Sequence, residues 1–228
     1  MPTEPAPPAP TRLVFSDVDE TLISRKSLID FFTYYFARRH GGSGRRHADQ
    51  TLRCLGALTA AGAPRDQGNL AYYRAWQGER ADDVAELVGH WYAAEGGEPG
   101  FYLPGTRAEL RAHREAGAVL VLVSGGFPAL LEPIAAEVGA HHLVCTVPEV
   151  RAGRLTGAVV GEPAIGQGKA AAVRAILARY PGLGPEDCWA YGDHVSDLPM
   201  LAEVGHPVVV GAEPALAAAL PSARVLYR

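Results

Sequence analysis

Two carboxylates stand one residue apart directly after a short apolar run of the sequence. The run Leu13-Val14-Phe15 has the composition of a buried strand, and Asp17 and Asp19 follow it. Carboxylates this close raise each other's pKa and cost folding free energy unless a cation or a reaction uses them. The pair is therefore a candidate catalytic or metal-binding pair, although an isolated Asp-x-Asp fits an acidic turn in solvent equally well.

Three more polar segments occur later in the chain, where apolar runs end or a helix begins. They are Ser124, Gly125 and Gly126 after residues 118–123, Gly166, Gln167 and Gly168 before Lys169, and Gly192, Asp193, His194, Ser196 and Asp197 after residues 188–191. Ligands of open α/β sheets collect beyond the carboxyl ends of the strands, so these segments are expected to converge. Their side chains suit phosphoryl transfer, in which oxygen ligands hold Mg²⁺, a carboxylate attacks phosphorus and hydrogen-bond donors surround the phosphate oxygens.

Two of these later segments also have a simpler interpretation. Ser124-Gly125-Gly126 fits a turn after a strand, and Lys169 fits a solvated position on a helix. The chain contains only two lysines, Lys26 and Lys169, among nineteen arginines, and this scarcity favours a specific role for Lys169.

The elements that would position these residues follow from the apolar pattern. From Pro104 onward, apolar runs alternate with segments of helical spacing, which predicts a three-layer α/β sandwich around a parallel sheet. A hairpin is predicted over residues 147–160, with its turn at Ala152-Gly153, and a capping box of Thr106 and Glu109 is expected to start a helix.

Residues 23–103 have a different character, because their apolar residues recur at helical spacing throughout. This pattern predicts an all-helical insert whose first helix starts at a capping box of Ser27 and Asp30 and is broken by the glycines at 41–44. We therefore divide the chain into a proline-rich disordered tail (residues 1–11), a core (residues 12–22 and 104–228) and a helical insert (residues 23–103).

Composition narrows the class of partner. The formal net charge of -4 argues against a nucleic-acid binder, and no apolar run approaches the roughly 20 residues of a membrane span. The three cysteines, Cys54, Cys145 and Cys188, have no disulfide or zinc spacing, which favours a reducing compartment. We expect a cytoplasmic protein whose partner is a small phosphorylated substrate.

The four polar segments resemble the four motifs of the haloacid dehalogenase (HAD) superfamily, in its Mg-dependent phosphatase branch. Asp17-x-Asp19-x-Thr21, Ser124-Gly125, Lys169 and Gly192-Asp193-x3-Asp197 match those motifs in type and order. The resemblance implies a Rossmann-like α/β/α core, and the insert lies where that superfamily has a C1-type helical cap. This cap, the Asp-Leu-Pro-Met segment at residues 197–200 and the predicted hairpin are most similar to subfamily IB, the phosphoserine-phosphatase-like group.

The resemblance also implies a role for each matching residue. Asp17 would be the nucleophile that forms an aspartyl-phosphate, and Asp19 the general acid and base. Mg²⁺ would be held by Asp17, Asp193 and the backbone carbonyl of Asp19. Ser124, Gly125 and Lys169 would bind phosphate oxygens, Thr21 would support the Asp17 loop, and Asp197 would either complete the metal shell through water or orient Lys169.

The chain departs from the family pattern at positions that bear on the substrate. His194 and Ser196 replace a common Gly and Asn, and Lys26 falls where phosphoserine phosphatases have a glutamate that reads the substrate's ammonium group. With Arg25 beside it, Lys26 predicts a substrate that carries an anionic group away from the scissile phosphate; the alternative is a lysine in solvent.

Two other functions stay open at this point. One is a phosphatase for phosphoserine or histidinol phosphate. The other is an inactive HAD-fold protein that binds a phospho-ligand or a partner through a basic part of the insert, residues 24–74, which holds nine Lys or Arg and three Asp.

Overall fold

A six-stranded parallel sheet forms the centre of the protein. The computed structural model describes residues 10–228, so most of the tail expected over residues 1–11 lies outside the described part. The strand order is β3-β2-β1-β6-β7-β8. The strands are β1 (Leu13–Ser16), β2 (Val119–Ser124), β3 (His142–Cys145), β6 (Cys188–Gly192), β7 (His206–Val210) and β8 (Arg224–Leu226).

The register of the central strands determines where the polar segments lie. Every residue of β1 and β2 is buried, as expected for strands covered on both faces. Ser16 of β1 pairs with Leu122 of β2 on one side and with Tyr191 of β6 on the other. Because these strands are parallel and in step, the residues that follow them emerge at the same edge of the sheet.

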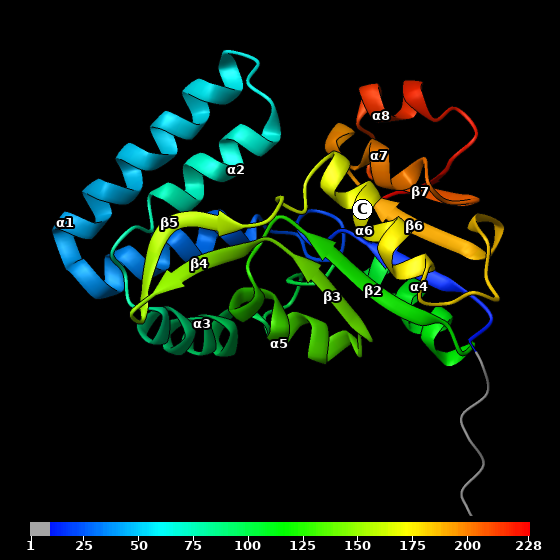
Figure 1. Ribbon diagram of the computed structural model, residues 1–228, viewed down its shortest axis with the longest axis horizontal. Coiled ribbons are helices and arrows are strands. Elements are labelled where there is room, and N and C mark those ends of the chain that lie inside the picture. Colours follow the sequence, from blue (N-terminus) through cyan, green and yellow to red (C-terminus); the bar gives the residue numbers. More distant parts are fainter. Residues whose placement is uncertain (1–9) are drawn as a thin grey trace, which may run out of the picture.

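Helices cover both faces of the sheet (Figure 1). The helices α4 (Pro104–Glu115) and α5 (Pro128–Val138) pack on one face, and α6 (Gln167–Leu177), α7 (Leu198–Leu201) and α8 (Pro214–Ala219) pack on the other. Leu120 and Leu122 of β2 face the first layer, whereas Val121 and Val123 face the second. The predicted three-layer sandwich around a parallel sheet is confirmed.

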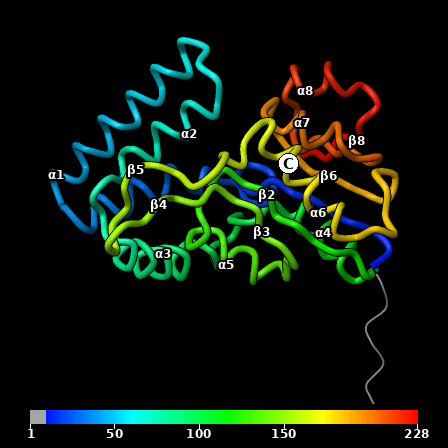
Figure 2. Tube along the Cα trace, in the orientation of Figure 1, coloured from blue at the N-terminus to red at the C-terminus, as the bar shows by residue number. Residues whose placement is uncertain are grey.

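The insert consists of three helices, α1 (Ser27–Ala60), α2 (Arg65–Arg74) and α3 (Ala81–Glu95), which lie to one side of the sheet (Figures 1 and 2). Its centre is aromatic, with Phe31, Phe32, Tyr35 and Trp76 almost fully buried. The predicted break is confirmed at Gly41 (φ 56°, ψ −129°), where two helical segments meet at a kink, and helical conformation then continues to Ala60.

Neither predicted capping box forms. The residue before α1 is Lys26, and Ser27 is already helical and donates its hydroxyl proton to Asp19 (2.6 Å). The helix α4 begins at Pro104, two residues before Thr106. Proline has no backbone N–H to be satisfied and its fixed φ suits the first helical position, so it starts the helix earlier than the Thr106 pattern indicates.

A two-stranded hairpin that extends from the core contacts the insert. It comprises β4 (Val147–Arg151) and β5 (Arg154–Val160), and its turn residues Ala152 and Gly153 both have positive φ, as predicted for a tight hairpin turn. The Leu155 amide and carbonyl bond to Glu79 and Gly78 of the insert. Among the described residues, no helix is long and apolar enough to cross a membrane.

Candidate active site

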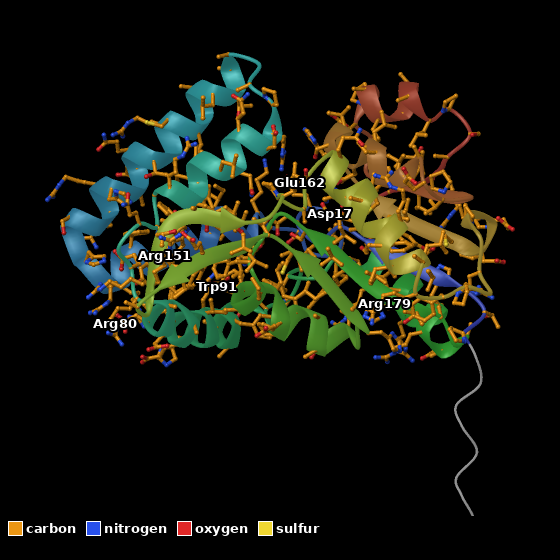
Figure 3. The ribbon with its side chains drawn as sticks, viewed as in Figure 1. Asp17, Arg80, Trp91, Arg151, Glu162 and Arg179 are labelled. Carbon is orange, nitrogen blue, oxygen red and sulfur yellow. The ribbon has the colours of Figure 1, made fainter. Side chains whose placement is uncertain are left out.

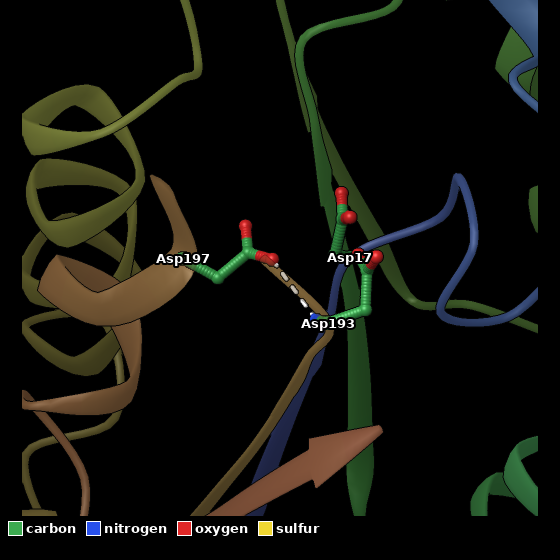
Figure 4. Close-up of side chains that lie close together, drawn as sticks. All are labelled: Asp17, Asp193 and Asp197. Atoms are coloured by element: carbon green, nitrogen blue, oxygen red, sulfur yellow. Dashed lines mark hydrogen bonds between the residues drawn. The ribbon is translucent and has the colours of Figure 1, made fainter. Parts of the chain in front are cut away.

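Four side chains from separate elements meet beyond the carboxyl ends of β1 and β6. Asp17 follows β1, Asp193 follows β6, Asp197 ends a short 3-10 turn (Val195–Asp197), and Lys169 lies in the first turn of α6. Figure 3 places Asp17 between the insert and the core, and Figure 4 shows the three carboxylates together. This convergence was predicted from the sequence, and it results from the parallel pairing of the adjacent strands β1 and β6.

Lys169 is a buried cation between two carboxylates. Its Nζ donates to Asp17 Oδ1 and to Asp197 Oδ1, each at 2.6 Å, and its side chain is 4% exposed. Burial lowers the pKa of Lys169, but Asp17 and Asp197 outweigh that effect and raise the pKa above its usual value. The ammonium group is therefore charged at neutral pH and fixed in direction, which excludes a solvated position on the helix.

Three carboxylates form a compact cluster. Asp17, Asp193 and Asp197 each offer an oxygen within 4.8 Å of the others. The second oxygen of Asp197 accepts the backbone amides of Asp193 and His194, each at 3.1 Å, and the first of these bonds is the dashed line in Figure 4. Thr21 Oγ1 donates to Asp193 at 3.0 Å and lies 3.5 Å from Asp17 Oδ2. The threonine thus lies against the acid cluster.

With all three carboxylates ionised, the cluster would carry more negative than positive charge, and the raised pKa values show that burial without a further cation opposes that ionisation. Burial raises the pKa of Asp17 to about 8, with Lys169 opposing the rise and Asp197 and Asp193 adding to it. Burial and Asp197 also raise the pKa of Asp193. Lys169 and the guanidinium of Arg228, 2.8 Å from Asp193 Oδ2, supply two positive charges against three carboxylates. An added cation would offset the remaining charge, and hard carboxylate oxygens are the ligands that Mg²⁺ prefers.

Asp19 lies beside this cluster in a different environment. Its Oδ1 accepts the hydroxyl proton of Ser27 (2.6 Å). Burial raises the pKa of Asp19 to about 6, and the Ser27 hydrogen bond opposes the rise. A carboxyl group that titrates near neutrality can both donate and accept a proton in a catalytic cycle.

The segment after β2 completes the edge of the site. Ser124 is 3% exposed and its Oγ accepts the Gly126 amide at 3.1 Å. A Cβ at position 125 would lie 2.6 Å from Ile165 and 3.2 Å from the Asn69 amide nitrogen, so only glycine fits there without displacing its neighbours.

A cavity of about 470 Å³ opens over these residues, between the core and the insert. Its core side includes Asp17, Asp19, Ser124, Gly125, Lys169, Asp193, His194 and Ser196. Its insert side is mostly apolar, with Leu28, Ile29, Leu55, Leu58, Ala63 and Pro64. The cavity therefore has an acidic end on the core and a mostly apolar end on the insert.

The basic residues of the insert are distributed differently from the prediction. Lys26 lines the cavity, with its Nζ 3.3 Å from Glu20, and Arg65 lines it as well. Arg25 is not in the cavity wall, because its guanidinium pairs with Glu95 at 2.9 Å and with Asp30. Its proposed part in specificity is therefore not supported by its position.

His194 and Ser196, the two departures from the family pattern, form hydrogen bonds with each other. The His194 Nδ1 accepts the Ser196 amide at 3.0 Å and lies 3.0 Å from the Ser196 hydroxyl, while Nε2 is 4.0 Å from Glu213. Both residues line the cavity; the His194 ring contacts Ser196, and only the backbone amide of His194 bonds to the acid cluster, at Asp197.

Sequence reasoning missed Asn69, Tyr73, Arg65 and Arg228, which come from α2 and from the last residue of the chain given. Asn69 and Tyr73 both donate to the Gly125 carbonyl, at 3.0 Å each. The one available signal in the sequence was the spacing of Asn69 and Tyr73, which lie four residues apart and therefore share a face of a helix.

Comparisons with known proteins agree with this geometry. A family model for haloacid dehalogenase-like hydrolases matches residues 14–202. A probable phosphatase of Mycobacterium tuberculosis is 31% identical over 219 residues, which cover 90% of this chain and 70% of that protein. A phosphoserine phosphatase of the same organism is 31% identical over 205 residues, which cover 90% of this chain but 45% of the relative.

Solved structures share the fold. A protein of unknown function from Bordetella pertussis superposes with a TM-score of 0.81 at 24% identity, covering 96% of this chain and 99% of that one. A substrate-bound phosphoserine phosphatase superposes with a TM-score of 0.72 at 19% identity, covering 96% and 94%. The motif order, the converging acid cluster and these matches agree, and the chain belongs to the haloacid dehalogenase-like hydrolases, as a phosphatase of the phosphoserine-phosphatase-like type.

Proposed function

We propose that this phosphatase is a Mg²⁺-dependent phosphomonoesterase that hydrolyses a small phosphorylated metabolite through an aspartyl-phosphate on Asp17. The observation that carries the proposal is the position of Asp17. Its carboxylate is held by Lys169 at 2.6 Å, next to Asp193 and Asp197, and it faces a cavity that Asp19 and Ser124 also line.

The proposed reaction has two displacements. In the first, an Asp17 carboxylate oxygen forms a bond to phosphorus while the ester O–P bond breaks, and Asp19 gives its proton to the leaving oxygen. In the second, the Asp19 carboxylate takes a proton from water, the water oxygen bonds to phosphorus, and the bond from Asp17 to phosphorus breaks. Phosphate is released and both carboxyl groups return to their starting states.

The remaining residues would bind the metal ion and the phosphate group, or orient the side chains that do so. Asp17, Asp193 and the backbone carbonyl of Asp19 would hold Mg²⁺, which when bound supplies positive charge to the phosphate oxygens. Lys169 adds a second positive charge. Both Asp197 oxygens are engaged by Lys169 and by two backbone amides, which favours orientation of Lys169 over a part in the metal shell.

The lining of the cavity favours a substrate whose leaving group is larger than that of phosphoserine. Six apolar side chains line its insert side, and Lys26 and Arg65 are its cations there. We propose a phosphorylated compound with an apolar body and an anionic group that reaches Lys26 or Arg65. Phosphoserine and histidinol phosphate are the alternative substrates, because Glu20, which pairs with Lys26, offers a carboxylate to an ammonium group.

We also propose that residues 23–103 open and close as a cap over the core at residues 12–22 and 104–228. The two connections between them bond to each other, through Ser24 N to Phe101 O (2.9 Å) and Leu103 N to Leu22 O (2.9 Å). Gly105 lies inside the first turn of α4, so we assign the motion to the paired connections and not to that glycine.

The test is turnover of p-nitrophenyl phosphate and of a panel of phosphate esters, with and without Mg²⁺. The panel contains phosphoserine, histidinol phosphate, sugar phosphates, diphosphorylated compounds and phosphorylated carboxylic acids. Asp17→Asn should abolish turnover while circular dichroism stays unchanged. No turnover of any ester by the wild-type protein would contradict the proposal and favour an inactive phospho-ligand-binding protein.

A further inference from the structure

Two side chains of the insert donate to the same carbonyl of the phosphate-binding segment. Asn69 Nδ2 and Tyr73 Oη, both on α2, each lie 3.0 Å from Gly125 O. All of the participants are out of solvent, since Asn69 is 6% exposed, Tyr73 1% and Ser124 3%. We propose that Asn69 and Tyr73 are positioning residues that couple the insert to the hydroxyl of Ser124; this inference rests on the proposed phosphatase function.

The coupling passes through one peptide group. The Gly125 carbonyl and the Gly126 N–H belong to the same peptide unit, and that N–H donates to Ser124 Oγ at 3.1 Å. Donors on the carbonyl polarise the peptide unit and strengthen the bond that its N–H makes, because successive hydrogen bonds in a chain reinforce one another. The insert therefore acts on Ser124 without touching it.

The bond from Gly126 also determines what Ser124 can do. Its oxygen is used as an acceptor, and within residues 10–228 no protein group accepts the hydroxyl proton in return. Ser124 lines the cavity, so the proton is free to be donated to an oxygen of a bound phosphate. The chain of donors then runs from Asn69 and Tyr73 through the peptide unit to the phosphate.

Two further features fit a positioning role. A carbonyl oxygen has two lone pairs, so two donors saturate Gly125 O and leave no acceptor there for a substrate group. The Asn69 Oδ1 is buried with no hydrogen-bond partner among the residues that the structure describes, which is unfavourable for folding. The position of Asn69 is thus explained by what its amide donates, not by an optimum of stability.

The consequence is a link between cap closure and phosphate binding. When α2 lies against the core, Gly125 O has both donors and Ser124 is held as a donor toward the cavity. When the insert moves away, the carbonyl loses both donors and the Ser124 segment loses its support. Phosphate is then bound firmly only in the closed state, which is also the state that excludes water.

The test is a set of single and double variants in the full-length protein. Tyr73→Phe and Asn69→Leu each remove a donor, and each should lower kcat/KM and weaken inhibition by inorganic phosphate by roughly 3- to 10-fold, the effect of one hydrogen bond. Tyr35→Phe is the matched control, because the Tyr35 hydroxyl donates to Glu79 inside the insert and does not line the cavity. It should leave both quantities unchanged.

A double-mutant cycle separates coupling through Ser124 from general loosening of the insert. In a Ser124→Ala background, Tyr73→Phe should change kcat/KM by less than about 2-fold, because the group on which it acts is gone. The same factor with and without Ser124 would overturn the inference, as would wild-type values for Tyr73→Phe.

A second measurement tests the coupling even if the protein is not a phosphatase. If the wild-type protein hydrolyses no ester, the coupling is judged by amide hydrogen exchange at Gly126, which should accelerate in Tyr73→Phe and not in Tyr35→Phe. Equal Gly126 exchange in the wild type and Tyr73→Phe would overturn the inference, whether or not the protein is an enzyme.

Discussion

Replacing Lys169 by methionine tests the central electrostatic feature of the site. The substitution keeps an unbranched apolar stem and removes the ammonium group that lies 2.6 Å from both Asp17 and Asp197. Both carboxylates are then left in a buried position without that partner. Removing one member of a buried ion pair typically lowers stability by about 3 to 5 kcal/mol. We expect the free energy of unfolding of Lys169→Met to fall within that range.

The chain offers a matched control in its only other lysine. The Lys26 side chain is 57% exposed and pairs with Glu20 at 3.3 Å, so Lys26→Met should change the free energy of unfolding by no more than about 1 kcal/mol. Urea denaturation followed by circular dichroism measures both variants under identical conditions. The same K→M exchange is thereby compared at a buried and at an exposed position.

A second substitution identifies why Lys169→Met lowers the free energy of unfolding. Asp197→Asn in the Lys169→Met background removes one of the uncompensated carboxylates and should recover part of the stability. A loss below about 1 kcal/mol for Lys169→Met would refute the buried ion triad. A loss that Asp197→Asn deepens would instead point to lost packing of the lysine stem.

Three other expectations are open to measurement. Thr21→Val, which removes the donor 3.0 Å from Asp193 Oδ1, should lower the free energy of unfolding by about 1 to 3 kcal/mol in urea titrations. EDTA should abolish turnover, and Mg²⁺ should restore it and raise Tm by offsetting the acid cluster; an unchanged Tm would argue against metal binding. Burial and the charge of Arg12 lower the pKa of His113 from its usual 6.5, and Glu109 opposes this shift. Because the folded state favours the neutral imidazole, the contribution of His113 to stability is complete above pH 6.5 and is lost as the pH falls. His113→Gln should therefore lose less stability than the wild type between pH 7 and 5, and parallel losses would contradict this assignment.

The fold class and the acidic end of the site could be predicted from the amino-acid pattern alone. Strands buried on both faces require continuous apolar runs, so β1 and β2 are visible as Leu13-Val14-Phe15 and Val119–Val123. Parallel strands place the residues after those runs at one edge, which is why Asp17, Ser124 and Asp193 were expected to converge. The turn at Ala152-Gly153 was also predictable from Gly153, because a two-residue hairpin turn requires positive φ and glycine adopts it without strain, although Ala152 shares that conformation.

Local patterns were misleading where a stronger constraint competed with them. Ser27 matches a capping signal, but its hydroxyl bonds to Asp19, and Thr106 is passed over because Pro104 starts the helix two residues earlier. In each case a contact or a backbone restriction outside the pattern decides the outcome.

The contacts between the insert and the core could not be predicted from the sequence, because they join residues far apart in the chain. The donors from Asn69 and Tyr73 to Gly125 O join residues 56 and 52 positions apart, and the pair between Arg228 and Asp193 spans 35 positions. No periodicity links such residues, because helical and strand patterns report only which face of an element is buried. The position of α2 over the sheet edge is set by packing of the aromatic residues of the insert, and that packing determines that Lys26 and Arg65, but not Arg25, line the cavity.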